Sequence, residues 1–233
     1  MERFLGWASR MSSSSKPLLH YHDVVIRQHD YDTLADHCWL NDAILDFHME
    51  YLDRNVISSD SKLKILLLRP GMVELIVHIQ DPTYLSSALP RDLDKADAIF
   101  IPINDSRPLA AYSGSHWSLM VFLRRFNAFF YYDSMGQSNG REAQLTRAQL
   151  TPLLGLQHSP AFVPVETPQQ NNSADCGVYV IAITDNLVQR LLQTGGNVPP
   201  ERLTRITKKD IRVKHIRKDL RQLIRSMQQQ QQQ

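Results

Sequence analysis

Residues 170–183 read Gln-Asn-Asn-Ser-Ala-Asp-Cys-Gly-Val-Tyr-Val-Ile-Ala-Ile. The polar half of this stretch leads into a predicted helix that runs from Cys176 to about Gln193 and is followed by Gly195 and Gly196. The first half of the helix is apolar on all sides, as is typical of a helix enclosed within a fold. Glycine commonly ends a helix because it adopts the left-handed backbone conformation without strain. The sequence therefore predicts a buried helix that begins at a cysteine.

Shorter helix and strand patterns precede this helix. Helices are predicted over residues 41–52, with Asn41 or Asp42 as the N-cap, and over residues 71–80. Strands are predicted over three apolar ranges, 98–103, 117–123 and 128–132. The last two are separated by four residues, which is a hairpin-length connection. Helices around a modest sheet indicate an α+β fold.

Length, charge and cysteine count exclude several classes of protein. The chain has 233 residues, enough for one large domain or two small ones, and a net charge of +2, which gives no field typical of nucleic-acid or membrane binding. Two cysteines, Cys38 and Cys176, are too few for a disulfide framework or a four-thiolate zinc site. The longest apolar run, residues 178–183, is far too short to span a membrane. We therefore expect a reduced compartment, the cytoplasm or the nucleus.

The two ends of the chain differ from its middle. Residues 1–16 are rich in serine and poor in acids, which we interpret as a flexible extension. Residues 201–225 carry ten Lys or Arg against three acids and predict an amphipathic helix with a solvated basic face; nucleic-acid binding is the weaker alternative. The glutamine run 228–233 is expected to be disordered. A single domain would then occupy residues 17–227.

Cys176 is a candidate nucleophile. Backbone N–H groups and the dipole at a helix N-terminus favour the thiolate, which is the reactive form. On position alone, however, a cysteine beside an apolar helix is more often a small buried hydrophobe. The choice depends on whether a base and an oxyanion donor lie near it.

His116 and Asp133 flank the predicted hairpin, one before its first strand and one after its second. If the turn is centred between Arg125 and Phe126, Ser118 lies opposite Asp133, and His116 lies two residues further along the same face. Such diagonal neighbours are within side-chain reach, whereas an odd-length turn would separate them. A carboxylate there could orient the imidazole, so the sequence contains the parts of a cysteine triad in the order His, Asp, Cys.

An amide in the loop before Cys176 could donate to the oxyanion of a tetrahedral intermediate. Gln170 lies six residues before the cysteine. Asn171 and Asn172 compete with it on chemical grounds.

Four short motifs follow one another along the chain: Trp39-Leu40-Asn41-Asp42, His116-Trp117-Ser118-Leu119, Tyr132-Asp133-Ser134, and the Gln-x-Asn-x-x-Asp-Cys-Gly pattern of residues 170–177. Their order and spacing resemble those of the ubiquitin-like-protein-specific cysteine proteases, the Ulp or sentrin-specific protease family. The resemblance spans about residues 20 to 225. It implies a papain-like fold of the Ulp type, with a central mixed sheet flanked by helices and a buried helix starting at the nucleophile.

The same resemblance implies a role for each matching residue. Cys176 would be the nucleophile, His116 its general base, Asp133 the residue that orients His116, and Gln170, rather than either asparagine, the oxyanion donor.

The resemblance also implies a binding site for the substrate tail. Trp39 and Trp117 match tryptophans that cover a narrow tunnel for the terminal Gly-Gly, and Asp42 matches an acidic residue that contacts the tail of the modifier. Broad apolar rings would admit glycines and exclude bulkier residues. Core packing is the alternative for both tryptophans. Cys38, beside Trp39, is interpreted as a core thiol.

Residues 25–30 and 103–105 resemble the deneddylases in particular, the members that act on the neddylation modifier. We therefore expect a monomeric protease that processes modifier precursors and conjugates, such as those of cullins, without a cofactor, nucleic acid or membrane. A SUMO-specific protease of the same family and a non-catalytic modifier binder are the alternatives. A metal is not expected, because no paired spacing typical of a zinc site occurs near Cys38 among His20, His22, His29 and His37.

Overall fold

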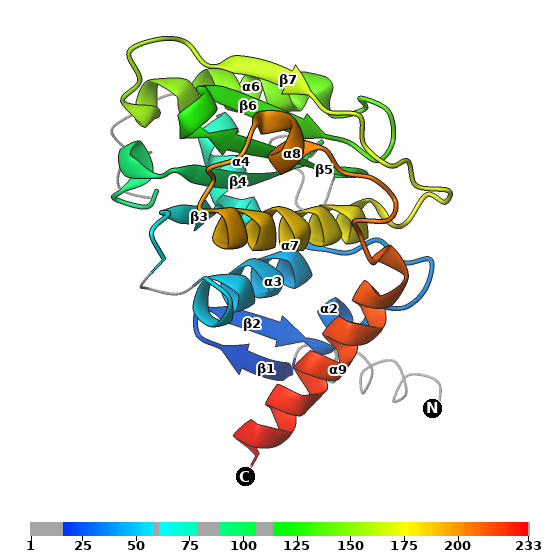
Figure 1. Ribbon diagram of the computed structural model, residues 1–233. Helices are drawn as coiled ribbons and strands as arrows, with labels where there is room; N and C mark the ends of the chain where they lie inside the picture. Colours follow the sequence, from blue (N-terminus) through cyan, green and yellow to red (C-terminus); the bar gives the residue numbers. More distant parts are fainter. Residues whose placement is uncertain (1–15, 58–60, 79–88, 106–113, 233) are drawn as a thin grey trace, which may run out of the picture.

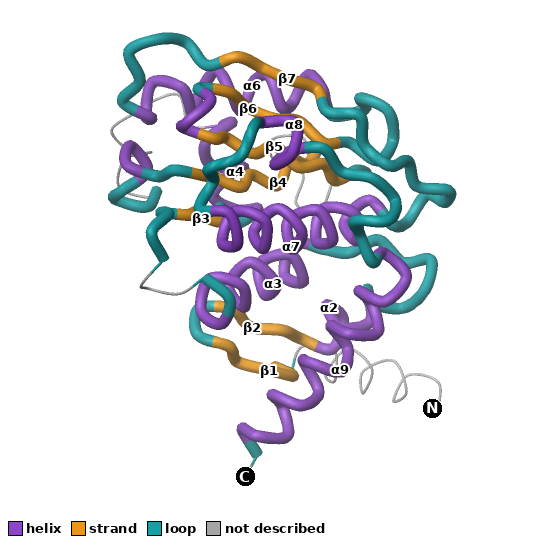
Figure 2. Tube along the Cα trace, viewed as in Figure 1, coloured by secondary structure: helices purple, strands orange, loops and turns teal. Residues whose placement is uncertain are grey.

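The computed structural model of the chain describes residues 16–57, 61–78, 89–105 and 114–232. Its centre is a five-stranded sheet in the order β3-β4-β5-β6-β7 (Figures 1 and 2). The two outer pairs, β3 with β4 and β6 with β7, are parallel, and the inner pairs are antiparallel. The strands are Ile65–Leu67, Ala98–Asn104, Trp117–Leu123, Ala128–Tyr132 and Ala161–Pro164. The expected mixed sheet in an α+β fold is confirmed.

The central strands are buried on both faces of the sheet. Every residue of β5 and β6 is buried, because successive side chains of a strand point to opposite faces and each face is covered. One face contributes Phe100, Leu119 and Val121 to a core shared with α7, and the other contributes Ile101 and Met120 to a second core.

Helices form a layer on each side of this sheet. The helices α7 (Cys176–Thr194) and α3 (Asp42–Asn55) lie below it in Figure 1, followed by the hairpin of β1 (Pro17–Tyr21) and β2 (Val24–Arg27). The opposite face is covered by α4 (Pro70–His78) and α6 (Gly140–Leu150). The helix α7 is thus enclosed between the sheet and α3, which explains why its first half is apolar all round.

Six further elements complete the described chain. Three are α-helices, α2 (Gln28–Asp32), α8 (Pro200–Thr204) and α9 (Val213–Gln231). Three are 3₁₀ turns, η1 (Leu93–Lys95), η2 (Arg124–Phe126) and η3 (Thr151–Leu154). None of the helices in the described ranges is long and apolar enough to cross a membrane.

Most predicted elements are present. The side chain of Asn41 caps α3 by accepting from the backbone N–H of Ile44, so Asn41 rather than Asp42 is the N-cap. The two hairpin strands have the predicted bounds, and α7 ends at Thr194, followed by Gly195 as the C-cap with a left-handed φ of 59°. The helix expected over residues 71–80 is α4; residues 79 and 80 lie outside the described ranges.

The single helix predicted over residues 201–225 is wrong. The chain leaves α8 after Thr204 and enters α9 only at Val213. Between them, a carboxylate oxygen of Asp210 accepts from both the backbone N–H (2.7 Å) and the hydroxyl (2.6 Å) of Thr207. Such local side-chain bonds compete with helical ones, and this competition interrupts the apolar pattern.

The glutamine run also departs from expectation. The helix α9 continues through Gln231, so the first four of the six glutamines are helical rather than disordered. Extending a formed helix adds a hydrogen bond per residue, and glutamine is a good helix former. The side chain of Gln231 also bonds to both backbone groups of His20 at β1. The extension predicted at the other end lies almost wholly outside the described residues.

Candidate active site

Cys176 is the first residue of α7, with Asp175 as the N-cap. Its side chain is 1% exposed and belongs to the core between the sheet and α7. The next residue has no side chain for a steric reason: a Cβ on Gly177 would lie 3.0 Å from the Cβ of Leu40 and 3.4 Å from the ring of Trp117. The glycine therefore lets the start of α7 approach the segment that carries Trp39 and Leu40.

The hairpin register brings His116 and Asp133 together, as predicted. Leu119 pairs with Tyr132 and Met120 with Tyr131, which is the expected even parity. His116 Nε2 lies 2.7 Å from Asp133 Oδ1, and both residues are buried. Since the carboxylate occupies Nε2, the ring nitrogen that remains for Cys176 is Nδ1.

The surroundings of His116 favour its charged form. Burial alone would lower its pKa, but the hydrogen bond to Asp133, the charge of that carboxylate and the neighbouring Cys176 raise the pKa to about 9. Burial would raise the pKa of Asp133, yet the bonds that it accepts from His116, Tyr131 and Met135 lower it below the usual range. Asp133 thus stabilises the imidazolium that forms when His116 takes a proton from the neighbouring thiol.

Two residues for which no role was predicted hold this pair. The hydroxyl of Tyr131 donates to Asp133 Oδ2 (2.7 Å), and the backbone N–H of Asn139 donates to the same oxygen (3.2 Å). The Asn139 side chain also donates to the carbonyl of His116 (2.9 Å). Tyr131 could have been found, because it shares a face with Asp133 two residues away; Asn139 follows an irregular turn and has no sequence signal.

Gln170 lies in the loop before Cys176, and both the oxygen and the nitrogen of its side-chain amide are hydrogen-bonded. Gln170 Oε1 accepts from the hydroxyl of Ser134 (2.7 Å), and Nε2 donates to the carbonyl of Asn172 (2.7 Å). Asn172 Oδ1 accepts from the backbone N–H groups of Ala174 (2.9 Å) and Asp175 (3.0 Å), so this side chain is committed to the loop. Asn171 is exposed. The amides of Gln170 and Asn172 are thus both fixed, and each donates one of its two N–H groups to a neighbour in the loop.

The two tryptophans have different environments. Trp117 is buried and donates to the carbonyl of Leu40 (2.9 Å). Trp39 is 51% exposed, so core packing does not apply to it, and it donates to the carbonyl of Ser173 (2.8 Å). The indole of Trp39 therefore lies across the loop that leads to Cys176.

Cys38 is exposed, so its interpretation as a core thiol is wrong. The backbone adopts a left-handed conformation at His37 (φ 63°), which turns the chain just before this residue. Leu40, two residues later, is buried in its place.

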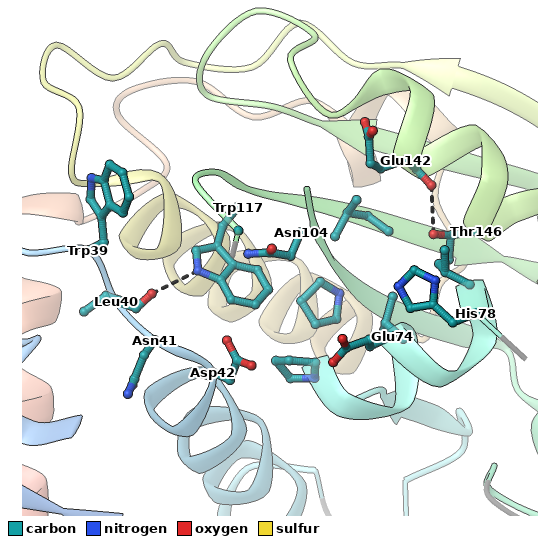
Figure 3. Close-up of a pocket in the computed structure, with 16 residues that line it drawn as sticks. Trp39, Leu40, Asn41, Asp42, Glu74, His78, Asn104, Trp117, Glu142 and Thr146 are labelled. Carbon is teal, nitrogen blue, oxygen red and sulfur yellow. Dashed lines mark hydrogen bonds between the residues drawn. The ribbon is translucent and has the colours of Figure 1, made fainter. Parts of the chain in front are cut away.

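Asp42 lines a cavity of about 420 Å³ that also contacts Trp39 and Trp117 (Figure 3). Glu74 and Glu142 contribute further carboxylates to its wall. Burial, and then the neighbouring charge of Glu74, raise the pKa of Asp42. The cavity is therefore acidic and adjoins the tryptophan that follows His116. In the described ranges no three His, Cys, Asp or Glu side chains group as metal ligands.

A buried cysteine at a helix N-terminus, beside an imidazole held by a carboxylate, is the arrangement of thiol-dependent hydrolases. Comparison with known proteins agrees with this class. The sequence model described as "Ulp1 protease family, C-terminal catalytic domain" matches residues 38–227. The chain belongs to this family of cysteine proteases.

Two relatives and one solved structure illustrate the similarity. Sentrin-specific protease 8 of Mus musculus is 37% identical over 196 residues, covering 82% of this chain and 88% of the relative. NEDD8-specific protease 1 of Arabidopsis thaliana is 30% identical over 223 residues, covering 93% and 96%. The C-terminal Ulp1 protease domain, solved in complex with Smt3, the yeast ortholog of SUMO, has the same fold, with a TM-score of 0.64, 20% identity and coverage of 94% and 93%.

Proposed function

We propose that this protein is a deneddylase, a cysteine protease that cleaves after the C-terminal Gly-Gly of the neddylation modifier. The observation that carries the proposal is the 2.7 Å bond between His116 and Asp133 beside Cys176 at the start of α7. The identity to relatives named NEDD8-specific protease in Arabidopsis thaliana (30%) and in Schizosaccharomyces pombe (36%) supports this substrate.

In the proposed mechanism, the Cys176 thiolate attacks the carbonyl carbon of the terminal glycine. His116 has taken the thiol proton and later gives it to the leaving amine, while Asp133 keeps the ring oriented and stabilises its charge. The unused N–H of Gln170 donates to the oxyanion. Water then hydrolyses the thioester, which releases the modifier and restores the thiol.

Recognition of the tail is proposed to involve Trp39, Trp117 and Asp42. An exposed indole and a buried one, each fixed by a bond to the backbone, can enclose two glycines and exclude side chains. The carboxylate of Asp42 lies next to Trp117 in an acidic cavity and would attract a cationic residue of the tail. The family resemblance extends the proposal to cullin conjugates as substrates, a monomeric enzyme and the cytoplasm or nucleus as its compartment.

The test incubates the wild-type protein and Cys176→Ala with C-terminally extended precursors of the neddylation modifier, SUMO and ubiquitin. We expect the wild type to trim the first precursor and Cys176→Ala to trim none. Equal cleavage by both proteins would exclude Cys176 as the nucleophile.

SUMO is the second candidate substrate, favoured by the fold shared with the Ulp1 domain bound to Smt3. Preferential cleavage of the SUMO precursor in the same panel would select it. A non-catalytic binder would instead bind a modifier with an electrophile at its terminal glycine and form no thioether with Cys176.

A further inference from the structure

The basic C-terminal helix has one buried cation, Arg217. The four other Lys or Arg residues of α9 are exposed, whereas Arg217 is 9% exposed. Burying a guanidinium is costly unless every donor is satisfied. The buried guanidinium of Arg217 therefore needs hydrogen-bond acceptors, and two separate segments of the chain supply them.

On one side, Arg217 binds the segment that leads to Trp39. Nη1 donates to the carbonyls of Thr33 and Ala35 (3.0 Å each), and Nη2 donates to the carbonyl of Cys38 (2.8 Å). These three oxygens belong to the turn that precedes the exposed indole. Arg217 thus fixes the backbone immediately before Trp39.

On the other side, Arg217 binds the two residues before Cys176. Nη2 donates to the carbonyl of Ala174 (3.1 Å) and to Asp175 Oδ1 (2.9 Å), and Nε donates to the same carboxylate oxygen (3.2 Å). One planar group therefore joins two segments of the candidate active site that are far apart in the sequence.

The contact continues through side chains to the proposed oxyanion donor. Asp175 Oδ2 accepts from Asn172 Nδ2 (2.8 Å), and the carbonyl of Asn172 accepts from Gln170 Nε2 (2.7 Å). The backbone N–H groups of Ala174 and Asp175 donate to Asn172 Oδ1. A hydrogen-bonded relay thus runs from Arg217 through Asp175 and Asn172 to Gln170.

We propose that Arg217 is a positioning residue that holds the Gln170 loop and the Trp39 segment in register with Cys176. The inference rests on the proposed protease function. Arg217 would act through the two segments rather than by contact with substrate. Lysine would not replace it, because a single ammonium lacks the planar fork that reaches acceptors on both sides.

The kinetic test compares Arg217→Met and Arg217→Lys with Arg221→Met, using a precursor of the neddylation modifier. Arg221 is the matched control because it lies one turn further along α9 and packs over the ring of Tyr31 instead. Turnover is expressed per site titrated with a Gly-Gly electrophile, so that unfolded protein is not counted. We expect kcat to fall about 10- to 100-fold in Arg217→Met, as for small misplacements of reacting groups, less in Arg217→Lys, and less than 2-fold in Arg221→Met. Unchanged kcat per titrated site in Arg217→Met would overturn the proposal.

Asn172→Ala keeps the test available if Arg217→Met does not fold. It interrupts the relay near its far end and should lower kcat by a similar factor. In the double variant Arg217→Lys/Asn172→Ala, the loss should be smaller than the product of the two single losses, because both changes break the relay to Gln170. A loss of kcat in the double variant equal to the product of the two single losses would contradict the relay.

Amide hydrogen exchange tests the positioning without any substrate. The amides of Ala174 and Asp175 should exchange at least about 10-fold faster in Arg217→Met or Arg217→Lys than in Arg221→Met. Equal exchange would refute the positioning role. If the wild type cleaves no precursor while these amides do respond, the proposed function fails and the contact of Arg217 with the loop stands.

Discussion

Asp133 Oδ1 lies 2.7 Å from His116 Nε2, and both residues are almost completely shielded from water. The carboxylate accepts two further bonds from backbone N–H groups, at Met135 and Asn139. It is therefore held rigidly by the protein before it orients the imidazole. The pair is a fixed part of the fold and not a contact made on substrate binding.

The first prediction removes the charge of this carboxylate. Asp133→Asn should lower kcat for a modifier precursor about 10²- to 10⁴-fold with little change in KM, because the wrong tautomer of His116 is stabilised. Tyr131→Phe is the control: it deletes one donor to Asp133 and should cost less than about 10-fold. A loss in Asp133→Asn no larger than that in Tyr131→Phe would show that Asp133 does not orient the base.

The second prediction concerns stability and pH. The folded-state pKa of His116, about 9, lies above its unfolded value of 6.5. Its contribution to the free energy of unfolding is therefore fully present below pH 6.5 and is lost as the pH rises through 9. Urea unfolding of wild type and His116→Gln should show the wild-type advantage falling by roughly 3 kcal/mol between pH 6 and pH 10. An advantage that stays constant or grows over that range would contradict the raised pKa.

The hairpin of the site could be predicted from sequence because each signal is local. Apolar strands fix the two ranges, and the even parity of the connection places His116 and Asp133 on one face. The structure adds the reason for that parity: Asn127 closes the turn with a left-handed conformation (φ 45°), which asparagine tolerates better than most residues. The position of Cys176 at a helix start was predictable for the same reason, from the switch between a polar loop and an apolar run.

The contacts of Arg217 could not be predicted, because they join residues far apart in the sequence. Arg217 is separated by 42 residues from Asp175 and by 184 residues from Thr33. The sequence of a basic amphipathic helix predicts that its charged face is exposed to solvent. Nothing in the neighbouring residues distinguishes the one buried arginine, Arg217, from the exposed ones. The break after α8 was missed because a turn closed by Asp210 interrupts an apolar pattern that continues on both sides. Periodicity alone does not register that interruption.

The third prediction separates the amides of the loop. Gln170→Ala should lower kcat about 10²- to 10³-fold, the usual cost of one oxyanion donor. Asn171→Ala should leave kcat within 2-fold, because that side chain is exposed. Both are measured with the same precursor at saturating concentration. A larger loss in Asn171→Ala would reassign the donor.

The fourth prediction concerns the acidic cavity in Figure 3. Asp42→Asn should raise KM for the modifier precursor about 3- to 10-fold and leave kcat nearly unchanged, because it removes binding that is equal in the ground and transition states. Asp53→Asn, in the last turn of the same helix, is the control and should change neither constant. An effect on kcat alone would place Asp42 in the chemistry instead of in tail binding.

The last prediction tests the close approach at the start of α7. Gly177→Ala places a Cβ 3.0 Å from the Cβ of Leu40, on a segment whose backbone is held by Arg217 and by the indole of Trp117. Because neither neighbour is free to move, the free energy of unfolding should fall by about 1–3 kcal/mol. Gly71→Ala in α4 is the matched control: its Cβ would meet nothing within 4 Å, so the gain in helix propensity should leave stability unchanged or up to about 1 kcal/mol higher. Thermal and urea unfolding of the two variants measure the difference, and equal stability in both would mean that the segment before Leu40 yields, contrary to the rigidity that the Arg217 contacts require.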